Sequence, residues 1–95
     1  MGASATQPQK RLGAWLVRVG ATVYQADTDG FVVASGDNDA QVVGLTDSIN
    51  PPTTEVAKDY GTAGGDMGSI TFPVKKNDYW EVTGIDTVFW IPLEP

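Results

Sequence analysis

Carboxylates are the main reactive groups of this chain, because its 95 residues include no histidine and no cysteine. The absence of imidazole excludes histidine-based acid–base catalysis, a Ser-His-Asp triad and histidine metal ligands. The absence of thiols excludes cysteine nucleophiles and the usual zinc sites. The 12 acidic residues could pair as in a glycosidase, but nothing in the sequence marks any of them as buried. We therefore predict no catalytic residue and a protein that is not an enzyme.

The most loop-like stretch, residues 47–66, holds the best candidates for ligand binding. Binding residues favour loops that a rigid scaffold carries. Carboxylate and amide acceptors beside an aromatic ring suit the hydroxyl groups of a sugar. The four candidates are Asp47, Asn50, Asp59 and Tyr60. Plain turn chemistry explains the same composition, since prolines stiffen a loop and glycines let it bend.

Two acidic clusters have a faint similarity to calcium-binding loops, Asp27-Thr28-Asp29-Gly30 and Asp37-Asn38-Asp39. Hard cations favour clustered oxygen ligands. An EF-hand loop carries more ligands and a distal glutamate, which neither cluster has. Hairpin turns account better for both clusters, and we predict no metal and no cofactor.

The charge balance argues against nucleic acid as a partner. The net charge is −6, whereas nucleic-acid binding needs clustered Lys and Arg. The six basic residues are dispersed: Lys10, Arg11, Arg18, Lys58, Lys75 and Lys76. No window approaches 18 consecutive apolar residues, so we predict no membrane insertion. The N-terminus lacks the apolar segment of a signal peptide.

From Leu12 onward, β-branched and aromatic residues come in short runs separated by turn residues. Turn signals about every 8–12 residues, without helical periodicity, are typical of an all-β sandwich or barrel. The expected strands are 12–19, 21–26, 30–35, 40–46, 53–58, 67–74, 79–83 and 86–93. The sequence thus predicts a compact antiparallel sandwich or jelly roll of about eight short strands over residues 12–95. Residues 1–11 read as a flexible tail or linker, or as a leader added for expression.

Alternation along the strands predicts which side chains enter the core. The expected inward side chains are Trp15, Ile70, Phe72, Val74, Trp80 and Val82. Thr71 should point away, and Pro73 favours an edge strand or a bulge. Asn77 can take the left-handed conformation that its turn requires. A short helix is the alternative to a strand over residues 53–60.

The last predicted strand is apolar on both sides, which a two-sheet domain does not explain. Val88 and Trp90 should point to one face, and the opposite face should carry Phe89, Ile91 and Leu93. Because a small domain covers only one face, we predict that the second face contacts another copy of the chain. Phe89→Asp should then give monomer or misfolded protein, and Thr71→Asp should change little.

Three stretches carry a family resemblance. They are residues 22–32 (TVYQADTDGFV), 70–80 (ITFPVKKNDYW) and 88–93 (VFWIPL). In this order they resemble the C-terminal head or tip domains of tail-fibre proteins of tailed bacteriophages and prophages. Those domains commonly show a dGFV strand, a FPVkkGD hairpin and a terminal aromatic F-x-P strand. Asn77 stands where that pattern has glycine, and asparagine tolerates the left-handed region better than most residues.

The resemblance implies a homotrimeric β-sandwich head at the distal end of a fibre shaft, on a virion. It also implies attachment to a bacterial surface glycan or protein receptor. Synthesis in the host cytoplasm and release by lysis would need no signal peptide. Three alternatives stay open. The domain could be a structural module that trimerises a shaft or decorates a capsid without a ligand, a polysaccharide-degrading enzyme domain, or a bacterial lectin of similar fold.

Overall fold

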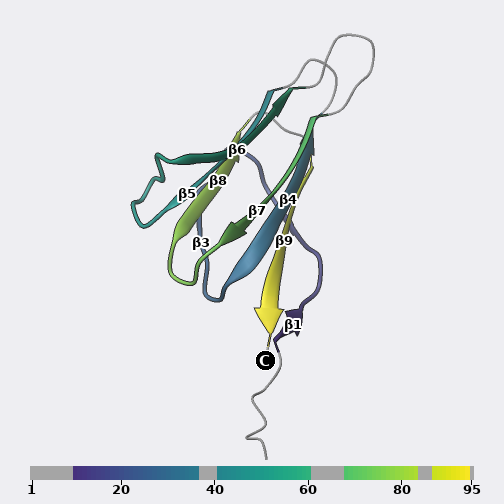
Figure 1. The fold of residues 1–95 in the computed structure, drawn as a ribbon, viewed down its shortest axis with the longest axis vertical. Helices are drawn as coiled ribbons and strands as arrows, with labels where there is room; N and C mark the ends of the chain where they lie inside the picture. Colours follow the sequence, from purple (N-terminus) through teal and green to yellow (C-terminus); the bar gives the residue numbers. More distant parts are fainter. Residues whose placement is uncertain (1–9, 37–40, 61–67, 84–86, 95) are drawn as a thin grey trace, which may run out of the picture.

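The computed structural model describes residues 10–36, 41–60, 68–83 and 87–94, and in these ranges it is an all-β sandwich (Figure 1). The first sheet contains β1 (Arg11–Leu12), β2 (Leu16–Arg18), β9 (Thr87–Glu94), β4 (Gly30–Gly36) and β7 (Gly68–Val74). The second sheet contains β3 (Tyr24–Gln25), β8 (Tyr79–Thr83), β5 (Gln41–Asp47) and β6 (Glu55–Tyr60). All strand pairs are antiparallel. The predicted fold class is confirmed.

The strand order is that of a jelly roll. The strands pair in a nested series, β5 with β6, β4 with β7, β3 with β8 and β2 with β9. Such nesting describes one long antiparallel ribbon, closed at its tip by the β5–β6 hairpin. Rolling the ribbon adds the pairs β4–β9 and β5–β8 and so creates the two sheets.

The core lies between the sheets and follows the predicted alternation. Burial alternates strictly along β7, with Ile70, Phe72 and Val74 inward and Thr71 exposed. Trp80 and Val82 of β8 are both 1% exposed. Trp80 also stacks on Trp90 of the opposite sheet, with ring centroids 5.8 Å apart. Aromatic contact between the sheets therefore adds to the burial of aliphatic side chains.

Most local predictions agree with the structure. Residues 55–60 form strand β6 rather than a helix, and Pro73 lies on β7, an edge strand of its sheet. Asn77 has a φ of 75°, in the left-handed region. The expected turn at Asp37–Asp39 and the connection between the expected strands 79–83 and 86–93 fall largely outside the described residues. Arg11, assigned to the tail, pairs with Glu94 in the sheet.

The prediction that Trp15 belongs to the core is wrong. The expected strand 12–19 splits, because Leu12 pairs with Leu93 whereas Leu16 pairs with Trp90. Four steps along this segment thus match three along β9, and the extra residue makes a bulge. Trp15 lies within this irregular stretch, 61% exposed, with its ring edge-on to Phe89 at 5.5 Å.

The outer face of the last strand, which carries Phe89 and Ile91, is less exposed to solvent than the sequence suggested. Val88 and Trp90 point into the core, at 2% and 4% exposure. On the other face Ile91 is 6% exposed and Phe89 is half-buried. The chain's own segment before β2 provides part of this cover through Trp15. Covering the face this way leaves Trp15 itself in solvent.

Two connections between the sheets are joined by hydrogen bonds at one end of the sandwich. Ala26 donates its N–H to the carbonyl of Asp78 (2.9 Å), and Asn77 donates to the carbonyl of Ala26 (2.7 Å). Lys76 donates its N–H to the Asp29 carboxylate (2.8 Å). The β3–β4 connection and the β7–β8 turn therefore hold each other in place, in line with the prediction that the Asp27–Gly30 cluster is a turn.

Gly44 of β5 packs against the Phe72 ring of the other sheet, which gives a test of the packing. A Cβ at this position would lie 2.3 Å from the Phe72 ring. We expect Gly44→Ala to lower the free energy of unfolding by about 1–3 kcal/mol through overpacking. In chemical denaturation, Gly44→Ala combined with Phe72→Leu should cost less than the sum of the two single changes. An unaltered stability of Gly44→Ala would contradict this packing.

Candidate ligand-binding cleft

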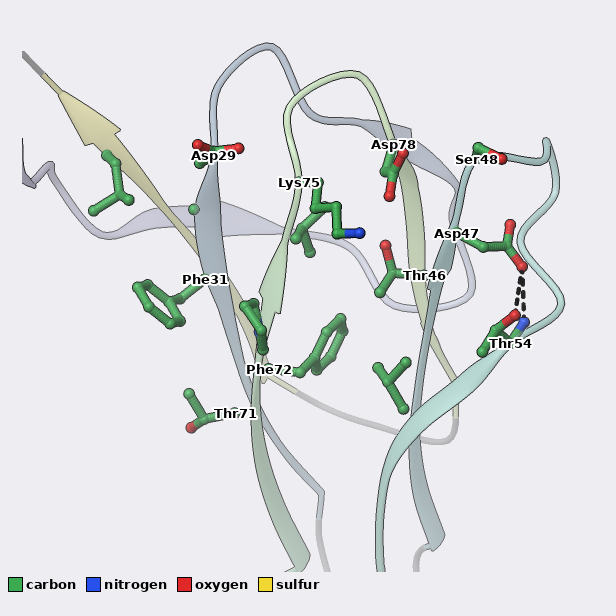
Figure 2. Close-up of a pocket in the computed structure, with 15 residues that line it drawn as sticks. Asp29, Phe31, Thr46, Asp47, Ser48, Thr54, Thr71, Phe72, Lys75 and Asp78 are labelled. Atoms are coloured by element: carbon green, nitrogen blue, oxygen red, sulfur yellow. Dashed lines mark hydrogen bonds between the residues drawn. The ribbon is translucent and has the colours of Figure 1, made fainter.

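A cavity of about 830 Å³ lies on the side where β6 and β7 form the free edges of the two sheets (Figure 2). It opens toward solvent and continues around β7 onto the outer side of the first sheet. We call it the edge cleft. Its lining residues are Asp29, Gly30, Phe31, Thr46, Asp47, Ser48, Thr54, Val56, Thr71, Phe72, Pro73, Val74, Lys75, Asp78 and Leu93.

The edge cleft combines an apolar interior with polar groups at its mouth. Phe72 reaches into it from β7, and Val56 of β6, 46% exposed, faces it from the opposite sheet. Figure 2 shows the Lys75 side chain extending from the β7–β8 turn into the cleft. Ser48 and Asp78 add a hydroxyl and a carboxylate to the rim. Within the described part of the chain, no hydrogen bond or ion pair engages the Lys75 ammonium.

Asp47, one of the four predicted ligand residues, lines this cleft, but the chain itself donates hydrogen bonds to its carboxylate. Oδ1 accepts the N–H of Ile49 at 2.8 Å. Oδ2 accepts the backbone N–H groups of Thr53 and Thr54, both at 2.9 Å, and both threonine hydroxyls, at 3.3 and 2.9 Å. These five donors tie the β5–β6 loop together. Oδ2 is saturated by four of them, so a ligand hydroxyl could bind only at Oδ1 without displacing a donor.

The same donors control the ionisation of Asp47. The N–H groups of Thr53 and Ile49, followed by the donors of Thr54, lower the pKa of the carboxyl from 3.8 to about 2. A carboxyl with such a pKa stays charged at neutral pH and holds no proton to give to a substrate. Asp47 therefore acts as a structural anion at the rim of the cleft.

The other predicted ligand residues do not gather around Asp47. Asn50 is exposed in the same loop, where the Asn50-Pro51 bond is cis. Asp59 and Tyr60 lie at the opposite end of β6, paired with Val42 and Gln41. At about 3.3 Å per residue, that end is about 16 Å from Asp47. The structure thus divides the four candidates between two ends of one hairpin.

Asp59 joins the two free edges. Its Oδ1 accepts the N–H of Tyr60 on β6, and its Oδ2 accepts the N–H of Ser69 on β7, both at 2.9 Å. The Tyr60 hydroxyl accepts a hydrogen bond from Gln41 at 3.0 Å. This carboxylate closes the sandwich at one end of the two edge strands, and the edge cleft opens toward the other end.

The contact with Asp59 also fixes which backbone groups β7 presents at its free edge. The Ser69 N–H points away from β4, because it reaches Asp59 on the other sheet. In an antiparallel ladder the direction alternates, so Thr71 and Pro73 also face outward. Proline has no N–H. Of the outward positions from Ser69 to Pro73, only Thr71 therefore retains an unused backbone donor.

The acidic cluster at Asp27–Gly30 serves as a connection between the sheets. Asp29 accepts the Lys76 N–H and forms an ion pair with Lys10 at 3.7 Å. The Lys76 N–H, with a smaller effect of Lys10, lowers the pKa of Asp29.

In residues 10–36, 41–60, 68–83 and 87–94 no three potential metal ligands come together, and no helix there is long and apolar enough to cross a membrane. The cluster Asp37–Asp39 lies outside the described residues.

Sequence reasoning missed most residues of the edge cleft. In the sequence Lys75 stands out only as one of six dispersed basic residues, and Val56 and Phe31 only as residues of predicted strands. These three positions are far apart in the sequence, and the cleft exists because β6 and β7 are edges of different sheets. One local feature of the sequence hints at the cleft: Val56 is an apolar residue on a strand that also carries the charged residues Glu55 and Lys58. The structure shows that this valine is exposed.

The pKa of Asp47 generates a pH-dependent prediction. Because the folded-state pKa lies below the unfolded value of 3.8, Asp47 stabilises the fold above pH 4 and loses this effect as the pH falls toward 2. We expect Asp47→Asn to be less stable than the wild type at pH 7 in urea denaturation, with the difference shrinking between pH 4 and 2. Asp27→Asn, the same charge change outside the loop, is the control. A difference that does not vary with pH would contradict the role of the ionised carboxylate.

Comparisons with protein-family models, with curated proteins and with solved structures find no match to this chain. The resemblance to tail-fibre heads therefore depends on the three sequence stretches alone. In the fold these stretches form the β3–β4 unit, the β7–β8 unit and β9. They include the two connections that are joined by hydrogen bonds and the strand that is apolar on both sides.

Proposed function

We propose that this domain is a non-enzymatic attachment module that holds a polyhydroxylated ligand, a bacterial surface glycan, in the edge cleft. The single observation that carries the proposal is the cleft itself. Its volume of about 830 Å³ falls in the range of small-molecule sites, about 300–1,000 Å³. The sequence resemblance to phage fibre tips supplies the biological setting, in which the domain ends a fibre and contacts the host.

The groups around the cleft suit a sugar better than a fully apolar ligand. Phe31 and Val56 offer apolar surface for the C–H face of a pyranose ring. Lys75 offers a charged donor, and Ser48 and Asp78 offer oxygen atoms that can accept from hydroxyls. A few convergent polar groups over an apolar lining are typical of specific ligand sites.

The state of the carboxylates favours binding over hydrolysis. Glycoside hydrolysis needs one carboxylic acid that is protonated at working pH. Two of the three cleft carboxylates, Asp47 and Asp29, instead have lowered pKa values, because each accepts hydrogen bonds from the backbone. A single shallow site would bind weakly, and several copies on one particle would raise the overall affinity, because later contacts become intramolecular.

Binding can be tested on an array of purified bacterial capsular and O-antigen polysaccharides. We expect the wild type to bind at least one of them, and Lys75→Glu to weaken that binding about tenfold or more through loss of a charge-assisted hydrogen bond. Lys76→Glu makes the same charge change on the next residue, whose side chain is not part of the cleft lining, and should bind like the wild type.

Three outcomes would overturn the proposal. A wild type that binds no polysaccharide would favour a purely structural module. Equal losses in Lys75→Glu and Lys76→Glu would indicate general electrostatic attraction instead of a site. Release of oligosaccharides from a bound polysaccharide would identify an enzyme.

A further inference from the structure

Within its strand pairs, the outer face of the first sheet carries no charged side chain, and the nearest charges are Asp29, which pairs with Lys10, and Lys75 beside the Leu12–Leu93 end. Residues directly opposite in the ladder share a face, which gives the row Val17, Phe89, Val33 and Thr71 and the row Ile91, Phe31 and Pro73. Leu12 beside Leu93 extends the face at one end, and Ser35 with Thr87 and Ser69 extends it at the other. Charged residues make up 19% of the chain, so their absence from the strand pairs of this face sets it apart.

The face also exposes large apolar side chains. Leu12 is 60% exposed, Trp15 is 61% exposed and Val17 is 73% exposed. Val19, which follows β2, is 65% exposed. Together these four residues present on the order of 500 Å² to solvent, and the half-buried Phe31, Val33 and Phe89 add to it. Soluble monomers rarely expose a larger contiguous apolar patch than this.

The second sheet cannot cover this face, because it packs on the opposite side of the same strands. Trp15 shields Phe89, but the N-terminal segment that supplies Trp15 is itself apolar. Trp15 therefore buries part of Phe89 but is itself exposed to solvent, so the face stays apolar.

We propose that a second copy of this chain packs on this outer face, through Leu12, Trp15 and Val17, with Val33 and Phe89 beside Val17 in the same row. A flat apolar sheet face packs best on another such face, at about 10 Å, and an identical copy provides one by symmetry. The charge distribution favours the same occupant. A face without charges offers nothing to an oppositely charged partner, while two chains of net charge −6 can meet there without placing carboxylates in contact.

The first test is the mass in solution, measured by light scattering from low to high micromolar concentration. We expect twice the 10.1 kDa of one chain, because two identical faces that pack on each other close as a pair. We also expect tighter association at high salt, because salt screens the repulsion between acidic copies and leaves the apolar contact intact. A single-chain mass at high micromolar concentration, or association that weakens with salt, would overturn the proposal.

A pair of matched variants locates the interface. Val17→Asp places a carboxylate on the outer face and should reduce the mass to that of one chain, with an unchanged far-UV circular dichroism spectrum. Val56→Asp is the same substitution on the other sheet, inside the edge cleft, and should assemble like the wild type. Assembly that survives Val17→Asp would exclude this face. Because Val17→Asp leaves the cleft intact, a failure of assembly and a failure of glycan binding are distinguishable.

Tryptophan fluorescence gives a measurement that does not depend on a folded Val17→Asp variant. Trp80 and Trp90 are buried at 1% and 4% exposure, whereas Trp15 lies in solvent. Emission of the wild type should therefore shift to the blue as concentration rises, and Trp15→Phe should abolish the shift. Emission that is constant while the mass increases would show that the copies meet elsewhere.

Discussion

The five hydrogen bonds to the Asp47 carboxylate hold the hairpin around which every other strand pair is nested. In the jelly roll, β5–β6 is the pair closest in sequence, and the pairs β4–β7, β3–β8 and β2–β9 enclose it one after another. The register of the inner hairpin limits how the outer strands can align, since the side chains alternate with period two. An anionic side chain in an exposed loop thus influences the placement of a core it does not touch.

Much of the fold could be predicted from alternation. Phe72, Val74, Trp80 and Val82 are buried as the pattern required, because a strand inside a sandwich has one side in the core. The same rule failed at Trp15, where a one-residue bulge shifts the segment relative to β9. Such bulges leave no clear trace in a short apolar run. The outward position of Thr71 was predicted, but its row contains Val33 and Phe89, so Thr71→Asp is a poor neutral control for contacts on that face.

The candidate site was harder to predict than the fold. Residue types indicated that Asp47 and Asp59 have suitable chemistry for a ligand, but their oxygens accept backbone N–H groups of Thr53, Tyr60 and Ser69. Backbone donors are invisible in a sequence, since every residue except proline has one. The edge cleft depends on how two sheet edges lie relative to each other, and no local pattern encodes that relation.

The blocked donors at the edge of β7 affect how this domain can associate with further copies of itself. A strand edge with a full row of open N–H and C=O groups recruits further strands and grows into cross-β aggregates. Here Asp59 occupies the Ser69 donor, and Pro73 has none to offer. The β7 edge therefore offers few donors for edge-to-edge pairing with another strand. Copies that associate as proposed would meet face to face, and this edge would not extend the assembly into a filament.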